Sequence, residues 1–148
     1  EYARARESAS EHPFQWGSKR TGPDLAREGG QKLRRSDSWH FLHLYDPREI
    51  TQGSLMPRYK WLIQNKLDIS TTPAKIRAMQ TLGVPYPEGY DKVANNDLMV
   101  QADSITASLK RENIETKPDR EIIAVIAYLQ RLGRDIEGEP KPVIASKN

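Results

Sequence analysis

Hydrophobic residues recur at helical spacing most clearly near the C-terminus of the chain. Pro118 precedes this segment and Gly133 follows it, which is the usual punctuation of a helix start and a helix end. The apolar positions are Ile122, Ile123, Val125, Ile126, Leu129 and Leu132. The pattern therefore predicts a helix that buries one wide apolar stripe.

Two more helices are predicted in the middle of the chain. Thr72 can cap a helix that has Pro73 at its first position and Gly83 just past its end. Asn96 can cap a second helix, whose apolar residues are spaced by four, three and four along one face. These residues are Leu98, Ala102, Ile105 and Leu109. Both segments favour an α fold.

A shorter helix is predicted over residues 39–45. Ser36 or Asp37 can cap its start, and Asp46-Pro47 ends it because proline removes the next helical hydrogen bond. Its apolar positions are Trp39, Leu42 and either His43 or Leu44. Residues 48–55 are expected to form a loop.

The remaining segments carry turn signals, and none supports a strand comparably. Gly22-Pro23 and Gly29-Gly30 punctuate residues 14–30. The tail, residues 137–148, contains proline and lysine without an apolar pattern, and we expect it to be disordered. The sequence therefore predicts a mostly α domain of short helices joined by long loops, over residues 1–136.

Composition limits the chemistry that the chain can perform. The 148 residues are enough for one domain with a core, and none of them is cysteine. Disulfides, cysteine-ligated zinc and thiol catalysis are therefore excluded for this sequence. The net charge of +3 comes from interleaved acidic and basic residues, whereas nucleic-acid binders usually gather positive charge on one face. We expect no nucleic-acid partner; the basic runs at 19–20 and 32–35 are solvated surface or dock on an acidic partner.

Met56 is the sharpest candidate for a functional residue. Gly53 precedes it and Pro57 follows it, so the thioether lies on a loop whose backbone is restricted. A thioether sulfur is a soft ligand suited to haem iron or copper. The alternative is that Met56 fills a gap in the core, which is a common role of methionine. From the residues alone, both interpretations stay open.

The histidines offer a weaker candidate. His40 and His43 are three residues apart and would share a helix face, where a pair of imidazoles can bind zinc. No third ligand lies near them in the sequence, so packing or solvent exposure of the pair is the better-supported interpretation. His12 precedes a proline and lies near Trp16, which fits a pocket or an ordinary loop. No Ser/His/Asp arrangement or phosphate loop is recognisable, and we expect no catalytic residues.

Several runs together resemble subunit II, the membrane-anchored mono-haem c subunit, of cbb3-type cytochrome c oxidases. The longest run is residues 12–25, and residues 39–40, 44–48, 54–57 and 81–86 follow in the order that the family has. The resemblance extends over residues 11–133. It implies a cytochrome c-like domain, present here in part, in which the last helix packs against an N-terminal helix.

The resemblance also implies roles for particular residues. Met56 stands where the family has the distal axial ligand of haem c, in a Ser-x-Met-Pro run. Gly22-Pro23 corresponds to the turn whose carbonyl supports the proximal histidine in c-type cytochromes. Trp16 and Arg20 are candidates to bind a haem propionate, because charge-assisted hydrogen bonds are strong. The alternative is that Arg20 only ties down its loop.

The sequence departs from the family pattern at its start. The family attaches haem through a Cys-x-x-Cys-His run that also supplies the proximal histidine, and a transmembrane anchor precedes that run. Neither is present in the sequence, which begins at Glu1. We expect a truncated chain that lacks haem c; a haem-free interaction or assembly module of the oxidase is the alternative. Apolar surface left uncovered would then lead to a homo-oligomer, or to a mobile loop at residues 54–61.

For the intact family member, the resemblance implies an electron relay from a c-type cytochrome to the oxygen-reducing subunit. The expected partners are that cytochrome, the catalytic subunit and the di-haem c subunit. The expected location is the periplasmic side of the bacterial inner membrane. The protein's part would be to hold the iron, to tune its potential through Met56 and to exclude water.

Overall fold

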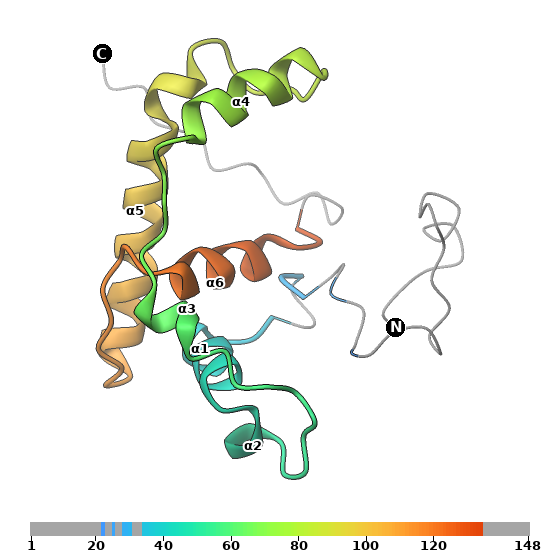
Figure 1. Ribbon diagram of the computed structural model, residues 1–148, viewed down its shortest axis with the longest axis vertical. Coiled ribbons are helices and arrows are strands. Elements are labelled where there is room, and N and C mark those ends of the chain that lie inside the picture. The colour runs from blue at the N-terminus through green and yellow to red at the C-terminus, as the bar shows by residue number, and fades with distance from the viewer. Residues whose placement is uncertain (1–21, 23–24, 26–27, 31–33, 135–148) are drawn as a thin grey trace. The chain divides into compact units, whose positions relative to one another are not determined.

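The computed structural model describes residues 22, 25, 28–30 and 34–134. Within them the chain forms six α-helices and no strand apart from one isolated antiparallel bridge between Lys66 and Arg120. The helices are α1 (Asp37–Tyr45), α2 (Pro47–Ile50), α3 (Trp61–Gln64), α4 (Thr72–Thr81), α5 (Tyr90–Arg111) and α6 (Glu121–Arg131), shown in Figure 1. The prediction of a mostly α fold with short helices is confirmed.

The chain divides into two compact units. One unit comprises Glu1–Arg35 together with Tyr128–Asn148, and the other is Ser36–Ala127. The predicted domain limits at residues 136 and 137 stay a prediction, and the tail at 137–148 lies outside the described residues.

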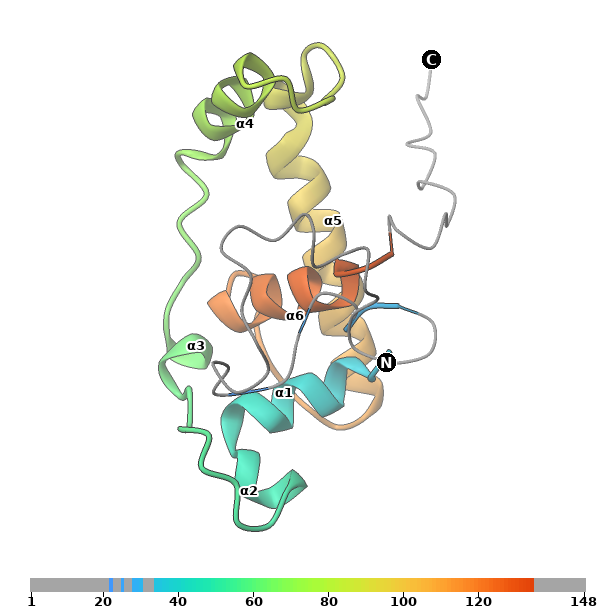
Figure 2. The same ribbon diagram turned by 90° about the vertical axis from the view of Figure 1, so that its right-hand side faces the viewer.

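The core of the larger unit is made by α1, the C-terminal half of α5, and α6. Leu109, Ile122 and Ile126 have no exposed surface. The buried cluster consists of Phe41, Leu44, Ala102, Ile105, Leu109, Ile122, Ile123 and Ile126. Figures 1 and 2 show α1 and α6 beside the C-terminal half of α5. The apolar face of α5 and the isoleucines of α6 are therefore buried as the periodicity predicts.

Helix α1 is capped as predicted and buries part of the predicted face. The Ser36 hydroxyl accepts a hydrogen bond from the Trp39 backbone N–H at 3.1 Å. Phe41 and Leu44 enter the core, whereas Trp39 is only half-buried. The predicted stripe is therefore right for Leu44 and for Leu42, which packs partly buried against the core, and wrong for Trp39, whose indole stacks on the His43 ring with centroids 4.5 Å apart.

Helix α5 begins at Tyr90, not at the predicted cap Asn96. Gly89 turns the chain into the helix with a left-handed φ of 74°, and Arg77 of α4 bonds Asp91 in the first turn. Tertiary contacts thus override the capping preference of asparagine, which is a weak local signal. Helix α4 starts one residue away from expectation, since Thr71 rather than Thr72 occupies the N-cap.

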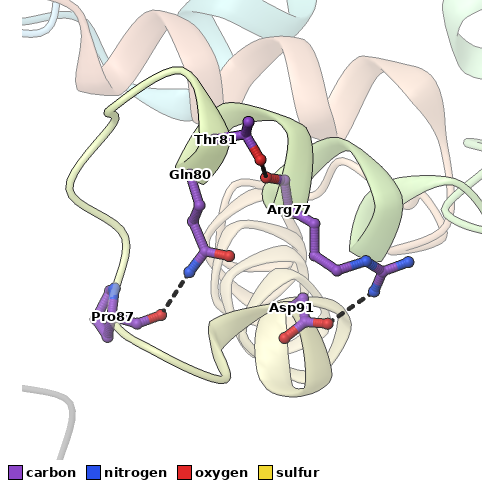
Figure 3. A network of polar contacts seen from close by, with 5 residues as sticks. All are labelled: Arg77, Gln80, Thr81, Pro87 and Asp91. Atoms are coloured by element: carbon purple, nitrogen blue, oxygen red, sulfur yellow. Dashed lines mark hydrogen bonds and ion pairs between the residues drawn. The ribbon is translucent and has the colours of Figure 1, made fainter.

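Polar contacts hold α4 to the start of α5 (Figure 3). Arg77 donates to Asp91 at 2.7 Å, and the Gln80 amide donates to the Pro87 carbonyl at 2.9 Å. Within α4, the Thr81 hydroxyl donates to the Arg77 carbonyl at 3.0 Å. No residue of α4 is buried. This hairpin lies at the end of α5 away from α1 and α6, as Figures 1 and 2 show. It therefore depends on polar contacts more than on a core.

The C-terminus of α5 is closed by a left-handed residue. Asn113 has a φ of 61°, and it is the one positive-φ residue other than glycine in the described part of the chain. The Ile114 N–H donates to the Leu109 carbonyl at 3.0 Å, and the Asn113 N–H donates to the Lys110 carbonyl at 3.1 Å. This is the hydrogen-bond pattern of a Schellman-type helix end.

In the smaller unit, Gly29 and Arg35 contact the end of α6 through their backbones. The Gly29 N–H donates to the Leu132 carbonyl at 2.8 Å, and the Gln130 amide donates to the Arg35 carbonyl at 2.8 Å. A Cβ atom at Gly29 would overlap the Gln130 carbonyl group, so this position requires glycine for close approach. Gly22 is exposed, and a Cβ there would meet nothing within 4 Å.

Replacing Gly29 with alanine should destabilise the protein by about 1–3 kcal/mol, because the methyl group cannot fit against α6. Gly22→Ala is the matched control and should change the free energy of unfolding by less than about 0.5 kcal/mol. Urea unfolding followed by circular dichroism measures both. Equal stabilities for the two variants would contradict the close approach.

Replacing Asn113 with valine should cost about 1–2 kcal/mol, because a β-branched residue is strained at positive φ. Asn113→Gly should be neutral or slightly stabilising at the same position. Thermal unfolding of the two variants beside the parent chain provides the comparison. A valine variant as stable as the glycine variant would show that this residue does not need the left-handed conformation.

Candidate functional site

Met56 lies on an irregular loop between two single-turn helices. We call residues 51–60 the Met56 loop; α2 precedes it and α3 follows it. The prediction that residues 48–55 form a loop is wrong for 48–50, which belong to α2. Asp46 explains the difference, because its side chain caps α2 by accepting from the Arg48 N–H at 3.3 Å, and Pro47 is preorganised for the first turn.

The first half of the loop forms a turn that is closed by hydrogen bonds between its own residues. Gly53 has a φ of 77°, and the Ser54 N–H donates to the Thr51 carbonyl at 3.1 Å. The Ser54 hydroxyl in turn accepts from the Met56 N–H at 3.2 Å, and the Ser54 carbonyl accepts from Arg48 at 3.4 Å. Ser54 therefore connects the turn, helix α2 and the backbone of Met56.

The second half of the loop is tied to the end of α1. The Tyr59 N–H donates to the Leu44 carbonyl at 2.9 Å. The Arg58 guanidinium forms an ion pair with the Asp46 carboxylate. Both contacts come within three residues of Met56, so they fix the direction in which the chain leaves it.

Beyond α3, the chain pairs with the start of α6. Arg120 donates through its side chain to the Gln64 carbonyl at 2.7 Å, and the Leu67 N–H donates to the Asp119 carbonyl at 2.9 Å. The Lys66–Arg120 bridge lies between these contacts. Residues 119–120, which lead into α6, thus anchor the segment that follows the loop.

The side chains of the loop divide between core and solvent. Met56 is half-buried and packs against the core cluster, whereas its neighbour Leu55 is 96% exposed. The Tyr59 and Trp61 rings form an edge-to-face pair with centroids 5.2 Å apart. Met56 therefore lies at the edge of the apolar core.

Two carboxylates of the region have perturbed acidities. Burial raises the pKa of Asp46, but the hydrogen bonds from Arg58 and the Arg48 backbone, together with both arginine charges, outweigh it, so the pKa lies below its ordinary value. The pKa of Asp68 is also lowered, chiefly by hydrogen bonds from the Ser70 hydroxyl and N–H, which outweigh burial. Both carboxylates are therefore ionised at neutral pH.

The structure places some of the predicted site residues and not others. Met56 and Gly22 are among the described residues. Gly22 is exposed, and a Cβ atom there would have no atom within 4 Å. Trp16, Arg20 and Pro23 lie outside the described residues, as does His12. The predicted roles of all five cofactor-binding residues, including Met56 as iron ligand, stay predictions.

The two helix histidines differ in their surroundings. His40 is buried, with the Trp39 ring edge-on to it at 5.3 Å, and His43 is half-buried under the same indole. In the described ranges, no group of three or more His, Cys, Asp or Glu residues is arranged to hold a metal ion. The same ranges contain no helix long and apolar enough to cross a membrane.

A haem group fits one side of this arrangement. Met56 offers a thioether, a soft donor suited to low-spin iron, and its surroundings are apolar. The printed sequence contains no cysteine, so it offers no thiol for covalent attachment of haem. A small all-helical domain with a methionine loop packed on its core belongs to the cytochrome c-like class.

Comparison with known proteins specifies the family. The family model described as cytochrome c oxidase, mono-heme subunit/FixO matches residues 1–136, and the chain belongs to this family. A search of curated proteins found no match. The chain is thus related to the mono-haem subunits of cbb3-type cytochrome c oxidases, proteins of electron transport that carry haem c.

Acid should destabilise the larger unit through Asp46 and Asp68. Because their folded-state pKa values are depressed, their contribution is fully present above about pH 4 and is lost as the pH falls through the lower folded-state values. Urea midpoints between about pH 6 and pH 2 measure this loss. The double variant Asp46→Asn, Asp68→Asn should lose less stability over that interval. A parallel pH dependence in the variant would contradict the assignment.

Proposed function

We propose that this chain holds the distal side of haem c in a cbb3-type oxidase. As part of that subunit it would relay electrons from a c-type cytochrome to the oxygen-reducing subunit. The observation that carries the proposal is the placement of Met56. Its thioether is half-buried against the core, on a loop that is held by contacts to α1, to Asp46 and to α2.

Bound haem supplies an iron that cycles between two oxidation states. The chain's own contribution is to offer Met56 Sδ as an axial ligand and to surround it with apolar side chains, because both choices raise the reduction potential. A loop tied at both ends also keeps the ligand in one position during oxidation and reduction, which favours rapid electron transfer.

The remaining site assignments rest on resemblance to the family. Trp16 and Arg20 would bind a haem propionate through the indole N–H and the guanidinium. The Gly22-Pro23 turn would offer a carbonyl to the proximal histidine, which a segment outside the printed sequence would supply. These roles agree with the chemistry of the residue types and await direct tests.

The proposed partners are the catalytic subunit, the di-haem c subunit and a c-type cytochrome, on the periplasmic side of the bacterial inner membrane. Membership of an oxidase family supports this setting. Leu55, next to Met56 in the chain, and Trp61, five residues after it, are exposed, and Lys60 directly precedes Trp61. Small, charge-steered interfaces of this composition are typical of transient electron-transfer partners.

A haem-free interaction or assembly module of the oxidase is the second candidate. The α4–α5 hairpin supports it, because residues 81–87 carry no charge and Leu82 there is 78% exposed. An apolar, uncharged connection of this kind is suited to docking on another subunit. The predicted homo-oligomer would use the same kind of surface, and scattering in solution measures it.

Adding haem and reductant to the purified chain should give a sharp reduced low-spin spectrum if Met56 can recruit iron. Met56→Ala should lose that spectrum, because the soft axial donor is gone. Met79→Ala is the matched control, since Met79 is partly exposed on α4 and should leave the spectrum unchanged. Identical visible spectra for the parent chain and Met56→Ala would overturn the ligand role.

A further inference from the structure

We propose that Asp46 is a positioning residue for Met56, acting through Arg58 and through the start of α2. The inference rests on the proposed role of Met56 as iron ligand. It gives a role to Asp46, which the sequence marks only as the end of a helix and as a member of the run at residues 44–48.

Asp46 connects three elements at one point. Its N–H donates to the Leu42 carbonyl at 2.8 Å and closes α1. One carboxylate oxygen accepts from the Arg48 N–H and opens α2, and the other pairs with Arg58 of the Met56 loop. The residue is 8% exposed, so these contacts are made close to the core and not in open solvent.

The connection to Met56 is short and stiff. Pro57 alone separates Met56 from Arg58, and its ring fixes φ near −65°. Holding the Arg58 side chain therefore restricts the orientation of the peptide units that carry Met56. The next residue adds a backbone anchor, since the Tyr59 N–H donates to the Leu44 carbonyl in the last turn of α1.

The α2 side of Asp46 controls the other end of the loop. By capping α2, Asp46 sets the place of Arg48, which donates to the Ser54 carbonyl. Ser54 then accepts from the Met56 N–H through its hydroxyl. One carboxylate thus restrains the chain on both sides of Met56.

The charge of Asp46 is balanced locally. Arg48 and Arg58 are the charged groups that face it, and Lys60 lies over the Tyr45 ring with its nitrogen 5.6 Å from the centroid. The Arg58 side chain is 47% exposed, so solvent screens part of the attraction. The main effect of the ion pair is therefore to fix a position, and its effect on overall stability is small.

Hydrogen exchange of the full chain tests the restraint directly. Asp46→Asn keeps a good N-cap side chain and the same shape but removes the charge that holds Arg58. The Met56 and Tyr59 amides, both hydrogen-bonded in the parent, should exchange roughly two- to tenfold faster in this variant. Amides of α5 in the core should not change. Unaltered exchange at Met56 and Tyr59 would overturn the proposal.

Asp68→Asn is the matched control. Asp68 also accepts a backbone hydrogen bond, from the Ser70 N–H at 2.9 Å, and its pKa is also lowered, but it lies between α3 and α4. This variant should leave exchange in the Met56 loop unchanged. Loosening of the loop by both variants to the same extent would show a general effect of lost charge and would overturn the specific role.

The arginine provides the second arm of the test. Arg58→Gln should loosen the loop as Asp46→Asn does, and the double variant should add little, because both changes break the same contact. Arg58→Lys should recover part of the protection, since lysine keeps the charge but loses the planar guanidinium group. Fully additive effects in the double variant would show that the two residues act separately.

A haem readout separates this inference from the proposed function. In the haem-loaded protein, Asp46→Asn should shift the reduction potential of the iron, and Asp68→Asn should not. If Asp46→Asn loosens the loop while Met56→Ala leaves the spectrum unchanged, the restraint stands and the ligand role of Met56 is overturned. If Met56→Ala abolishes the spectrum and Asp46→Asn changes neither exchange nor potential, the ligand role stands and the restraint is overturned.

Discussion

The burial of the α6 isoleucines against α5 and α1 is the interaction on which the larger unit depends. Ile122 and Ile126 have no exposed surface, and neither has Leu109 of α5, which belongs to the same cluster. Burying one such side chain contributes about 1.5–3 kcal/mol, comparable to several hydrogen bonds of the loops. Burial of the isoleucine cluster therefore stabilises this unit more than any one of its hydrogen bonds does, and polar contacts elsewhere serve to orient the chain.

The Met56 loop shows how an irregular segment uses that base. The loop lacks the regular backbone hydrogen bonds of a helix or sheet. Its peptide groups instead bond to the Ser54 hydroxyl, to the end of α1 and to a side chain of α2. The segment after it is held by Arg120, the residue that precedes α6. The loop and the segment after it are therefore held next to α1 and α6, which pack in the core. A ligand on the loop is held in place by these contacts.

The spacing of apolar residues predicted the helices that bury one face in the core, which are α5 and α6. The apolar faces of α5 and α6 are read directly from the spacing of Ala102, Ile105 and Leu109 and from the isoleucines. The start of α5 was missed because Gly89 and the Arg77–Asp91 pair define it, and both act between elements. Helices α2 and α3 were missed because four residues are too few to establish a 3.6-residue period.

The same division applies to the candidate site. Met56 could be singled out because a soft donor beside proline is a local signal. Asp46 could not, because its importance depends on Arg58, twelve residues away in sequence, and on a turn that ends one helix and begins the next. A metal ligand needs more than a donor atom: without a second side chain that fixes the backbone on either side, a flexible thioether would sample several rotamers and bind iron weakly. In this chain Asp46, which the sequence marks only as the end of a helix, is the group best placed to restrict the motion of Met56.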